Sequence, residues 1–100
     1  MTDQLRAVLL DQQSFGERLS FTRLRQSSPH FETYPETTAD NVSTRCQNAD
    51  IIITNKVTVD AATIAAAKNL KLICVTATGT NNIDHQAATQ RGIPICNVTH

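Results

Sequence analysis

Short, continuous apolar runs recur along this chain, and they limit its possible folds more than any other feature. Three of them are Ala7–Leu10, Ile51–Ile53 and Leu72–Val75. Because these runs do not alternate with polar residues, they are typical of strands covered on both faces, as in a parallel sheet. Ile93–Val98 is similar, with a proline near its start, and His30–Tyr34 alternates as an edge strand does. The pattern predicts five strands.

Helical signals lie between the runs. Thr37–Asp40 has the spacing of a capping box ahead of a short amphipathic segment. The alanine-rich segment Ala61–Lys68 has Asp60 at its start and a lysine at its end, which suits the helix dipole. Both segments are therefore predicted to be helices.

A third helix is expected from His85 to Arg91, with Asp84 as its N-cap and Gly92 as the residue that ends it. Residues 12 to 29 have no clear period and are interpreted as a loop with a helical turn or two. Alternating strands and helices predict an α/β, flavodoxin-like fold. It would have a parallel five-stranded sheet of order 2-1-3-4-5 with helices on both faces.

Composition excludes several classes of protein. The chain has 100 residues, a formal net charge of zero and a pI near 6.8, so it has no basic stripe for nucleic acid. No apolar run approaches the ~18 residues needed to span a membrane, and no secretory leader precedes the first strand. We expect a cytoplasmic protein whose three cysteines, Cys46, Cys74 and Cys96, are reduced, buried thiols and not metal ligands.

The loop after the third long apolar run is the best candidate for a ligand site. In a parallel sheet, ligands bind beyond the carboxyl ends of the strands, and here Thr76–Asp84 joins a strand to a helix with small and hydroxyl residues and Gly79. Such a loop can direct several N–H groups at an anion, although it can also be an ordinary turn. A flavodoxin-type phosphate loop has similar residues, but it follows the first strand, where this chain has Asp11–Ser14.

A longer match supports the anion-binding interpretation. The segments Asn48–Val57, Asn69–Asp84 and Ala87–Val98 resemble the D-isomer-specific 2-hydroxyacid dehydrogenases, most closely their glycerate dehydrogenase (hydroxypyruvate reductase) branch. The resemblance is strong over about half the chain. It implies that residues 1 to 100 are the N-terminal segment of a substrate domain, acting on a small 2-oxo or 2-hydroxy acid.

The resemblance also implies the site residues. The family's loop that matches Ala77, Thr78 and Gly79 holds the substrate carboxylate with backbone amides, and the loop around Lys56 lines the same cleft. A lysine in that place is either a positive charge near the carboxylate or only a solvated side chain. No residue of this chain is assigned a catalytic, cofactor-binding or metal-binding role.

The family's hydride transfer uses NAD or NADP bound at a Gly-x-Gly-x-x-Gly turn. This sequence has only Gly16, Gly79 and Gly92, so that turn and its nucleotide-binding domain are absent. The resemblance implies an oxidoreductase that is a homodimer when complete, and we expect the isolated chain to be inactive and to bind no nicotinamide cofactor.

Two alternatives have other functions. A receiver-type signalling module shares the flavodoxin-like fold, but it needs an aspartate at the end of the third strand, where this chain has Thr54. A non-catalytic binding module on the dehydrogenase scaffold stays open.

Overall fold

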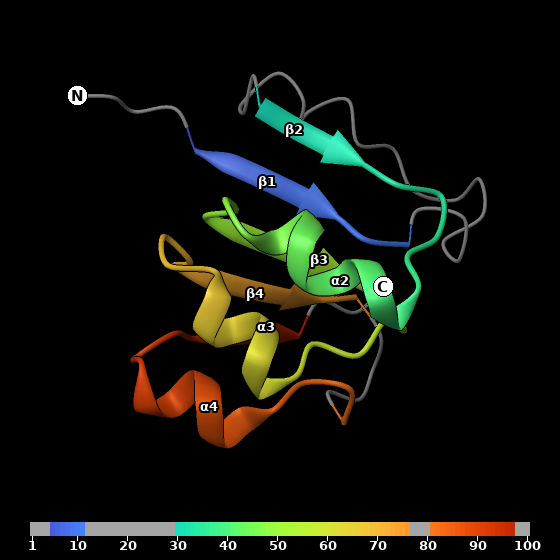
Figure 1. The fold of residues 1–100 in the computed structure, drawn as a ribbon. Helices are drawn as coiled ribbons and strands as arrows, with labels where there is room; N and C mark the ends of the chain where they lie inside the picture. Colours follow the sequence, from blue (N-terminus) through green and yellow to red (C-terminus); the bar gives the residue numbers. More distant parts are fainter. Residues whose placement is uncertain (1–4, 12–29, 77–80, 98–100) are drawn as a thin grey trace.

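The structure is a computed structural model, and it describes residues 5–11, 30–76 and 81–97. Its centre is a five-stranded sheet in the order β2-β1-β3-β4-β5, with every neighbouring pair of strands parallel (Figure 1). The predicted fold class and strand order are confirmed. All strands therefore end at one edge of the sheet, and the loops that follow them meet there.

The strands begin and end close to the expected residues. They are β1 (Arg6–Leu9), β2 (His30–Thr33), β3 (Ile51–Thr54), β4 (Leu72–Val75) and β5 (Ile95–Asn97). The largest difference is in β5, which begins after Pro94 and not at Ile93, because the proline has no N–H to pair with β4. The carbonyl of Pro94 nevertheless accepts a hydrogen bond from the N–H of Ile73, at 3.1 Å.

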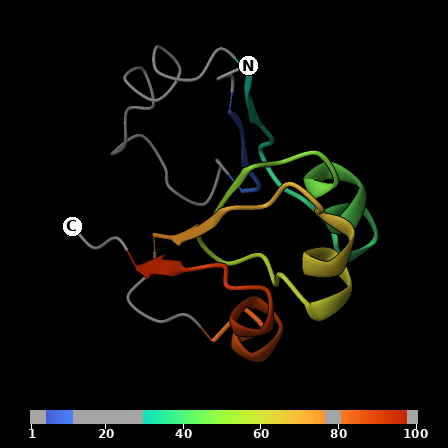
Figure 2. The same ribbon diagram turned by 90° about the vertical axis from the view of Figure 1, so that its left-hand side faces the viewer.

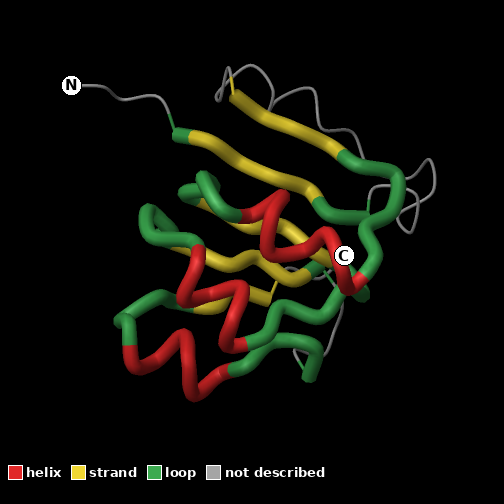
Figure 3. Tube along the Cα trace, in the orientation of Figure 1, coloured by secondary structure: helices red, strands yellow, loops and turns green. Residues whose placement is uncertain are grey.

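The three described helices are α2 (Ala39–Cys46), α3 (Ala61–Ala66) and α4 (His85–Gln90). All three lie on the same face of the sheet, as the edge-on view and the tube drawing show (Figures 2 and 3). The prediction of helices on both faces of the sheet is thus confirmed for one face. Residues 12 to 29, interpreted from the sequence as a loop with a helical turn or two, lie outside the described residues.

The core fills the space between this sheet face and the helices. Its strand residues include Val8, Ile52, Ile73 and Val75, each 2% exposed or less. Burying one such side chain stabilises the fold by about 1.5–3 kcal/mol relative to leaving it in water. The helices and their loops contribute the rest of the cluster, which includes Val42, Cys46, Val59, Ile64, Ala67, Ile83 and Ala88.

Helix α2 is not capped in the way that the sequence suggests. Thr38 is the N-cap of α2 and its side chain makes no capping bond. The Thr37 hydroxyl instead donates to the carbonyl of Leu10 at 2.6 Å and accepts from the Arg45 guanidinium at 2.8 Å. The capping-box prediction is wrong because a contact to the end of β1 takes up this hydroxyl.

Helix α3 ends earlier than expected. Asp60 is its N-cap and accepts from the Thr63 N–H at 2.9 Å, but α3 stops at Ala66, so Lys68 lies beyond its last turn. The Arg91 guanidinium takes the place expected of the lysine. It donates to the carbonyl of Ile64, to that of Ala67 at 2.9 Å and to that of Lys68 at 3.2 Å. Arg91 therefore satisfies carbonyls that the end of α3 leaves free.

The predicted cap and end of helix α4 are confirmed. Asp84 caps α4 by accepting from the Ala87 N–H at 3.0 Å, and Gly92 has the left-handed φ of 68° that ends such a helix. No helix among residues 5–11, 30–76 and 81–97 is long and apolar enough to cross a membrane.

The prediction of buried cysteines holds in part. Cys46 is fully buried in the core, and burial raises the pKa of its thiol to about 12. Cys74 is only partly buried, and Cys96 is exposed. The prediction is wrong for Cys96 because it lies on the outermost strand, β5, and faces away from the helices.

Candidate functional site

The candidate site lies at the carboxyl edge of the sheet, where β1, β3 and β4 end side by side. Asp11 follows β1, Asn55 and Lys56 follow β3, and Thr76 follows β4. Loops at such an edge bind ligands because no secondary structure uses all of their N–H groups.

A buried carboxylate organises the first of these loops. Asp11 is 5% exposed, and its two oxygens accept the N–H of Asn55 at 2.9 Å and the N–H of Lys56 at 2.7 Å. Hydrogen bonds to a charged group stabilise by about 1.5–3 kcal/mol each. Asp11 therefore fixes the backbone of the β3 loop from the neighbouring strand.

The same loop is held on its other side. The Thr54 hydroxyl accepts from the Val57 N–H at 3.0 Å, and it also lies 3.1 Å from the Val57 carbonyl oxygen. The Asn82 side-chain amide donates to that carbonyl at 2.8 Å. Backbone bonds join Val59 to Asn82 and Asp84, at 2.8 and 3.0 Å. The segment after β3 is thus tied to the segment that leads into α4.

These contacts place Lys56, one of the four residues predicted to bind substrate. Its backbone is fixed by Asp11, while its side chain is exposed at the carboxyl edge. The other three, Ala77, Thr78 and Gly79, lie outside the described residues, so their role stays a prediction.

Both ends of that undescribed loop are nevertheless fixed. Before it, the Thr76 N–H donates to the Thr54 carbonyl at 3.0 Å, continuing the pairing of β3 and β4. After it, Asn82 and Asp84 are held by Val57, Val59 and the start of α4. Thr76 and Asn82, on either side of this segment, are therefore held by the end of β3 and the loop that follows it.

Thr76 adds a polar atom that the rest of the described structure does not use. Its Oγ1 is buried and has no hydrogen-bond partner among the described residues. An unsatisfied buried hydroxyl costs about 1–3 kcal/mol, so such an atom at a ligand-binding edge is a candidate to bond the neighbouring loop or a ligand.

Sequence reasoning gave Lys56 a role in substrate binding and placed Thr76 and Asn82 in the candidate loop without a role, but it missed Asp11. One signal was available for Asp11, since an acid directly after a continuous apolar run lies at the end of a buried strand. The pairing of Asn82 with Val57 has no local signal, because the two residues belong to different loops.

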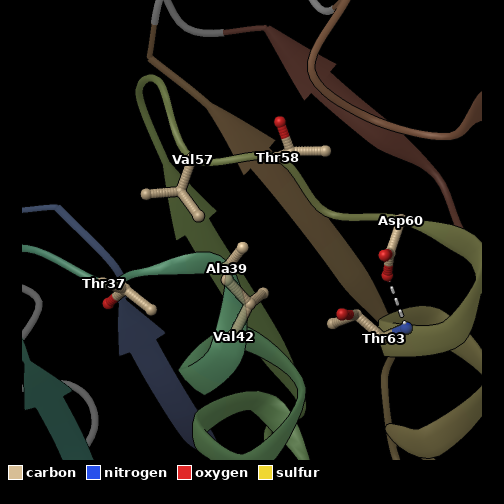
Figure 4. A pocket seen from close by; sticks show the side chains of 7 residues that line it. All are labelled: Thr37, Ala39, Val42, Val57, Thr58, Asp60 and Thr63. Atoms are coloured by element: carbon tan, nitrogen blue, oxygen red, sulfur yellow. Dashed lines mark hydrogen bonds between the residues drawn. The ribbon is translucent and has the colours of Figure 1, made fainter.

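A separate groove of about 240 Å³ opens near this edge, between the N-terminal ends of α2 and α3 (Figure 4). Ala39, Val42 and Val57 give it an apolar wall. The Asp60 carboxylate lies in its lining and is already bonded to the Thr63 N–H, as the dashed line shows. A carboxylate in the wall disfavours an anionic acid here, so the groove is not the predicted substrate site.

Comparison with known sequences gives matches along nearly the whole chain. The sequence model of the D-isomer specific 2-hydroxyacid dehydrogenase catalytic domain matches residues 8–100. A Haemophilus influenzae protein named as a 2-hydroxyacid dehydrogenase is 40% identical over 99 residues, which cover 95% of this chain and 30% of that protein. The glycerate dehydrogenase of Methylorubrum extorquens is 37% identical over 95 residues, 93% of this chain and 29% of that enzyme.

A solved structure has the same fold. The NAD⁺-bound 3-phosphoglycerate dehydrogenase of Entamoeba histolytica superposes with a TM-score of 0.78 at 23% identity, over 95% of this chain and 33% of that one. The chain thus spans about a third of the length of the proteins that it matches.

Proposed function

Because the chain belongs to the D-isomer specific 2-hydroxyacid dehydrogenase family, we propose that it is the N-terminal part of the substrate domain of such an enzyme. The complete protein would interconvert a small D-2-hydroxy acid and its 2-oxo acid, with glycerate and hydroxypyruvate as the first pair to test. NAD or NADP would supply or accept the hydride. We assign none of this chain's residues to that cofactor, since its sequence has no glycine-rich turn for a pyrophosphate.

In this proposal the chain holds the carboxylate end of the substrate. Backbone N–H groups of Ala77, Thr78 and Gly79 would donate to the carboxylate, each charge-assisted bond contributing about 1.5–3 kcal/mol. The exposed Lys56 would add a positive charge from the neighbouring loop. The observation that carries the proposal is the bracing of both loops, through Asp11 on one side and Asn82 on the other.

Bracing matters because a carboxylate site is effective only when its donors are already in place. A loop free to move would lose binding energy in ordering itself. The bonds of Asp11 to Asn55 and Lys56 hold one wall of the site, and the bonds of Asn82 and Asp84 hold the far end of the other.

The test uses the longest natural polypeptide that contains these residues. The assay follows the oxidation of NADH and of NADPH with hydroxypyruvate, glyoxylate or pyruvate as the 2-oxo acid substrate. We expect Gly79→Val to lower kcat/KM about tenfold or more, as the loss of one charge-assisted bond predicts, and Thr78→Ser to change it little.

Gly92→Ala is the matched control. This glycine has a left-handed φ at the C-terminal end of α4, away from the carboxyl edge, so its replacement should lower the melting temperature and leave kcat/KM unchanged. If Gly79→Val behaves like Gly92→Ala, the loop is only a connection. If the folded protein binds a 2-oxo acid but turns over none, the non-catalytic alternative is correct.

A further inference from the structure

Two thiols that the proposed function does not use are paired on neighbouring strands. Cys74 of β4 and Cys96 of β5 are direct partners in the parallel register. Residues paired in this way project from the same face of a sheet. Their neighbours Ile73 and Ile95, also partners, pack against the core beneath the helices, so both thiols project from the opposite face.

The registered neighbours of Cys74 toward the centre of the sheet are apolar. On the inner side, Cys74 is in register with Ile53, which is in register with Leu9. Among the described residues no group of three or more His, Cys, Asp or Glu side chains is placed to hold a metal ion. Cys74 is partly buried and Cys96 is exposed, so the pair is accessible from solvent on its outer side.

The spacing of the strands decides what this pair can bind. Equivalent atoms of registered residues on parallel strands are separated by about the strand spacing, ~4.8 Å. A disulfide needs Cβ atoms about 3.5–4.5 Å apart and a Cβ–S–S–Cβ dihedral of about 85–100°, and side chains that project in parallel at the strand spacing suit neither condition well. A soft metal ion with two bonds to sulfur of about 2.3 Å bridges sulfurs about 4.6 Å apart, which is close to the strand spacing.

We propose that Cys74 and Cys96 form a two-thiolate site for a soft monovalent d¹⁰ cation, of which Cu⁺ is the biological member. Thiolates select such ions, and Cu⁺ is satisfied by two ligands, whereas structural Zn²⁺ requires four. Each thiol releases its proton to solvent and forms one sulfur–copper bond. Two thiols and one Cu⁺ thus give an anionic dithiolate complex and two protons, with no change of oxidation state.

The electrostatics agree with this geometry. Burial, and secondarily the negative charge of a Cys96 thiolate, raise the pKa of the Cys74 thiol. A cation between the sulfurs turns that repulsion between thiolates into attraction to the metal. Since binding displaces two protons, affinity for Cu⁺ should increase with pH.

The test is an anaerobic titration of the longest natural polypeptide that contains these residues with Cu⁺, supplied as its acetonitrile complex, against a chromogenic Cu⁺ chelator. Native mass spectrometry gives the stoichiometry, and X-ray absorption counts the sulfur neighbours. We expect one copper per chain and two sulfur ligands. Loss of a residue that only supports a metal ligand weakens metal binding by up to about 100-fold. Removing a ligand itself, by Cys74→Ser or Cys96→Ser, should weaken Cu⁺ binding by more than that.

Cys46→Ser is the matched control. That thiol is fully buried in the core on the helix side, so its loss should leave Cu⁺ affinity unchanged. Cys96 is exposed, which makes Cys96→Ser safe for folding, and circular dichroism checks each variant. Three results would overturn the proposal: Cu⁺ affinity indifferent to Cys96→Ser, one copper shared by two chains, or Zn²⁺ bound as tightly through the same thiols.

Discussion

The carboxylate of Asp11 gives the sharpest test of how the candidate site is built. In Asp11→Asn one oxygen remains to accept a backbone N–H, but the new amide N–H₂ group faces the second donor. The variant loses one bond to a charged group, about 1.5–3 kcal/mol, and leaves a buried N–H unsatisfied at a cost of about 1–3 kcal/mol. We expect the free energy of unfolding to fall by about 3 kcal/mol.

Urea and thermal unfolding followed by circular dichroism measure this loss. About 3 kcal/mol corresponds to a decrease of about 12 °C or more in melting temperature for a domain of this size. Asp40→Asn is the matched control, because Asp40 is exposed in the first turn of α2 and should cost no more than about 1 kcal/mol through the helix dipole.

Under the proposed function, Asp11→Asn should also raise KM for the 2-oxo acid in the longest natural polypeptide, because the Lys56 backbone is released. Equal effects of Asp11→Asn and Asp40→Asn on unfolding would refute the argument that the Asp11 carboxylate braces the β3 loop.

Three further predictions concern the helices and the buried thiol. Arg91→Ala should lower the free energy of unfolding by about 1–3 kcal/mol, because carbonyls at the end of α3, including that of Ala67, lose their donors; Arg91→Lys should restore part of it in urea unfolding. The hydrogen bonds from Thr63 hold the pKa of Asp60 below its usual value, so its cap stabilises the fold above about pH 4 and this contribution disappears as pH falls through the lowered pKa. The melting temperature of Asp60→Asn should therefore approach that of the wild type between about pH 6 and pH 2, and a gap that widens on acidification would contradict the cap. The Cys46 thiol should resist alkylation in the folded chain at neutral pH, with mass spectrometry of the labelled peptides as the measurement, and labelling as fast as in urea would disprove its burial.

The strand order could be predicted because each strand has a recognisable pattern and alternating strands and helices are typical of a doubly wound sheet, for which 2-1-3-4-5 is a common order. What the sequence could not supply were contacts between segments distant in the chain. The Thr37 hydroxyl bonds the end of β1 instead of its own helix, and Arg91 caps α3 from the end of α4. Local capping rules describe only a helix and its flanks, so both partners were missed.

The residues of the candidate site also differ in whether a local sequence pattern reveals them. Family resemblance indicated Lys56 and the loop at Gly79, because short motifs are visible in one sequence. Asp11 and Asn82 support that region only through register, as β1 lies beside β3 and the β3 loop lies beside the start of α4. Supporting residues of this kind become visible only when the strands are placed side by side.

The position of β1 has a consequence for how the chain is assembled on the ribosome. β1 is made first, yet its partners are β2 on one side and β3 on the other, and Ala7 pairs with Ile51. Its pairing with β2 can form early, but its pairing with β3 must wait for half of the chain to emerge. The other neighbouring strands, β1 with β2, β3 with β4 and β4 with β5, close shorter loops and cost less chain entropy when they pair. Until β3 has been made, the edge of β1 that pairs with it has no partner, and an unpaired apolar strand edge is a site of aggregation in a nascent polypeptide.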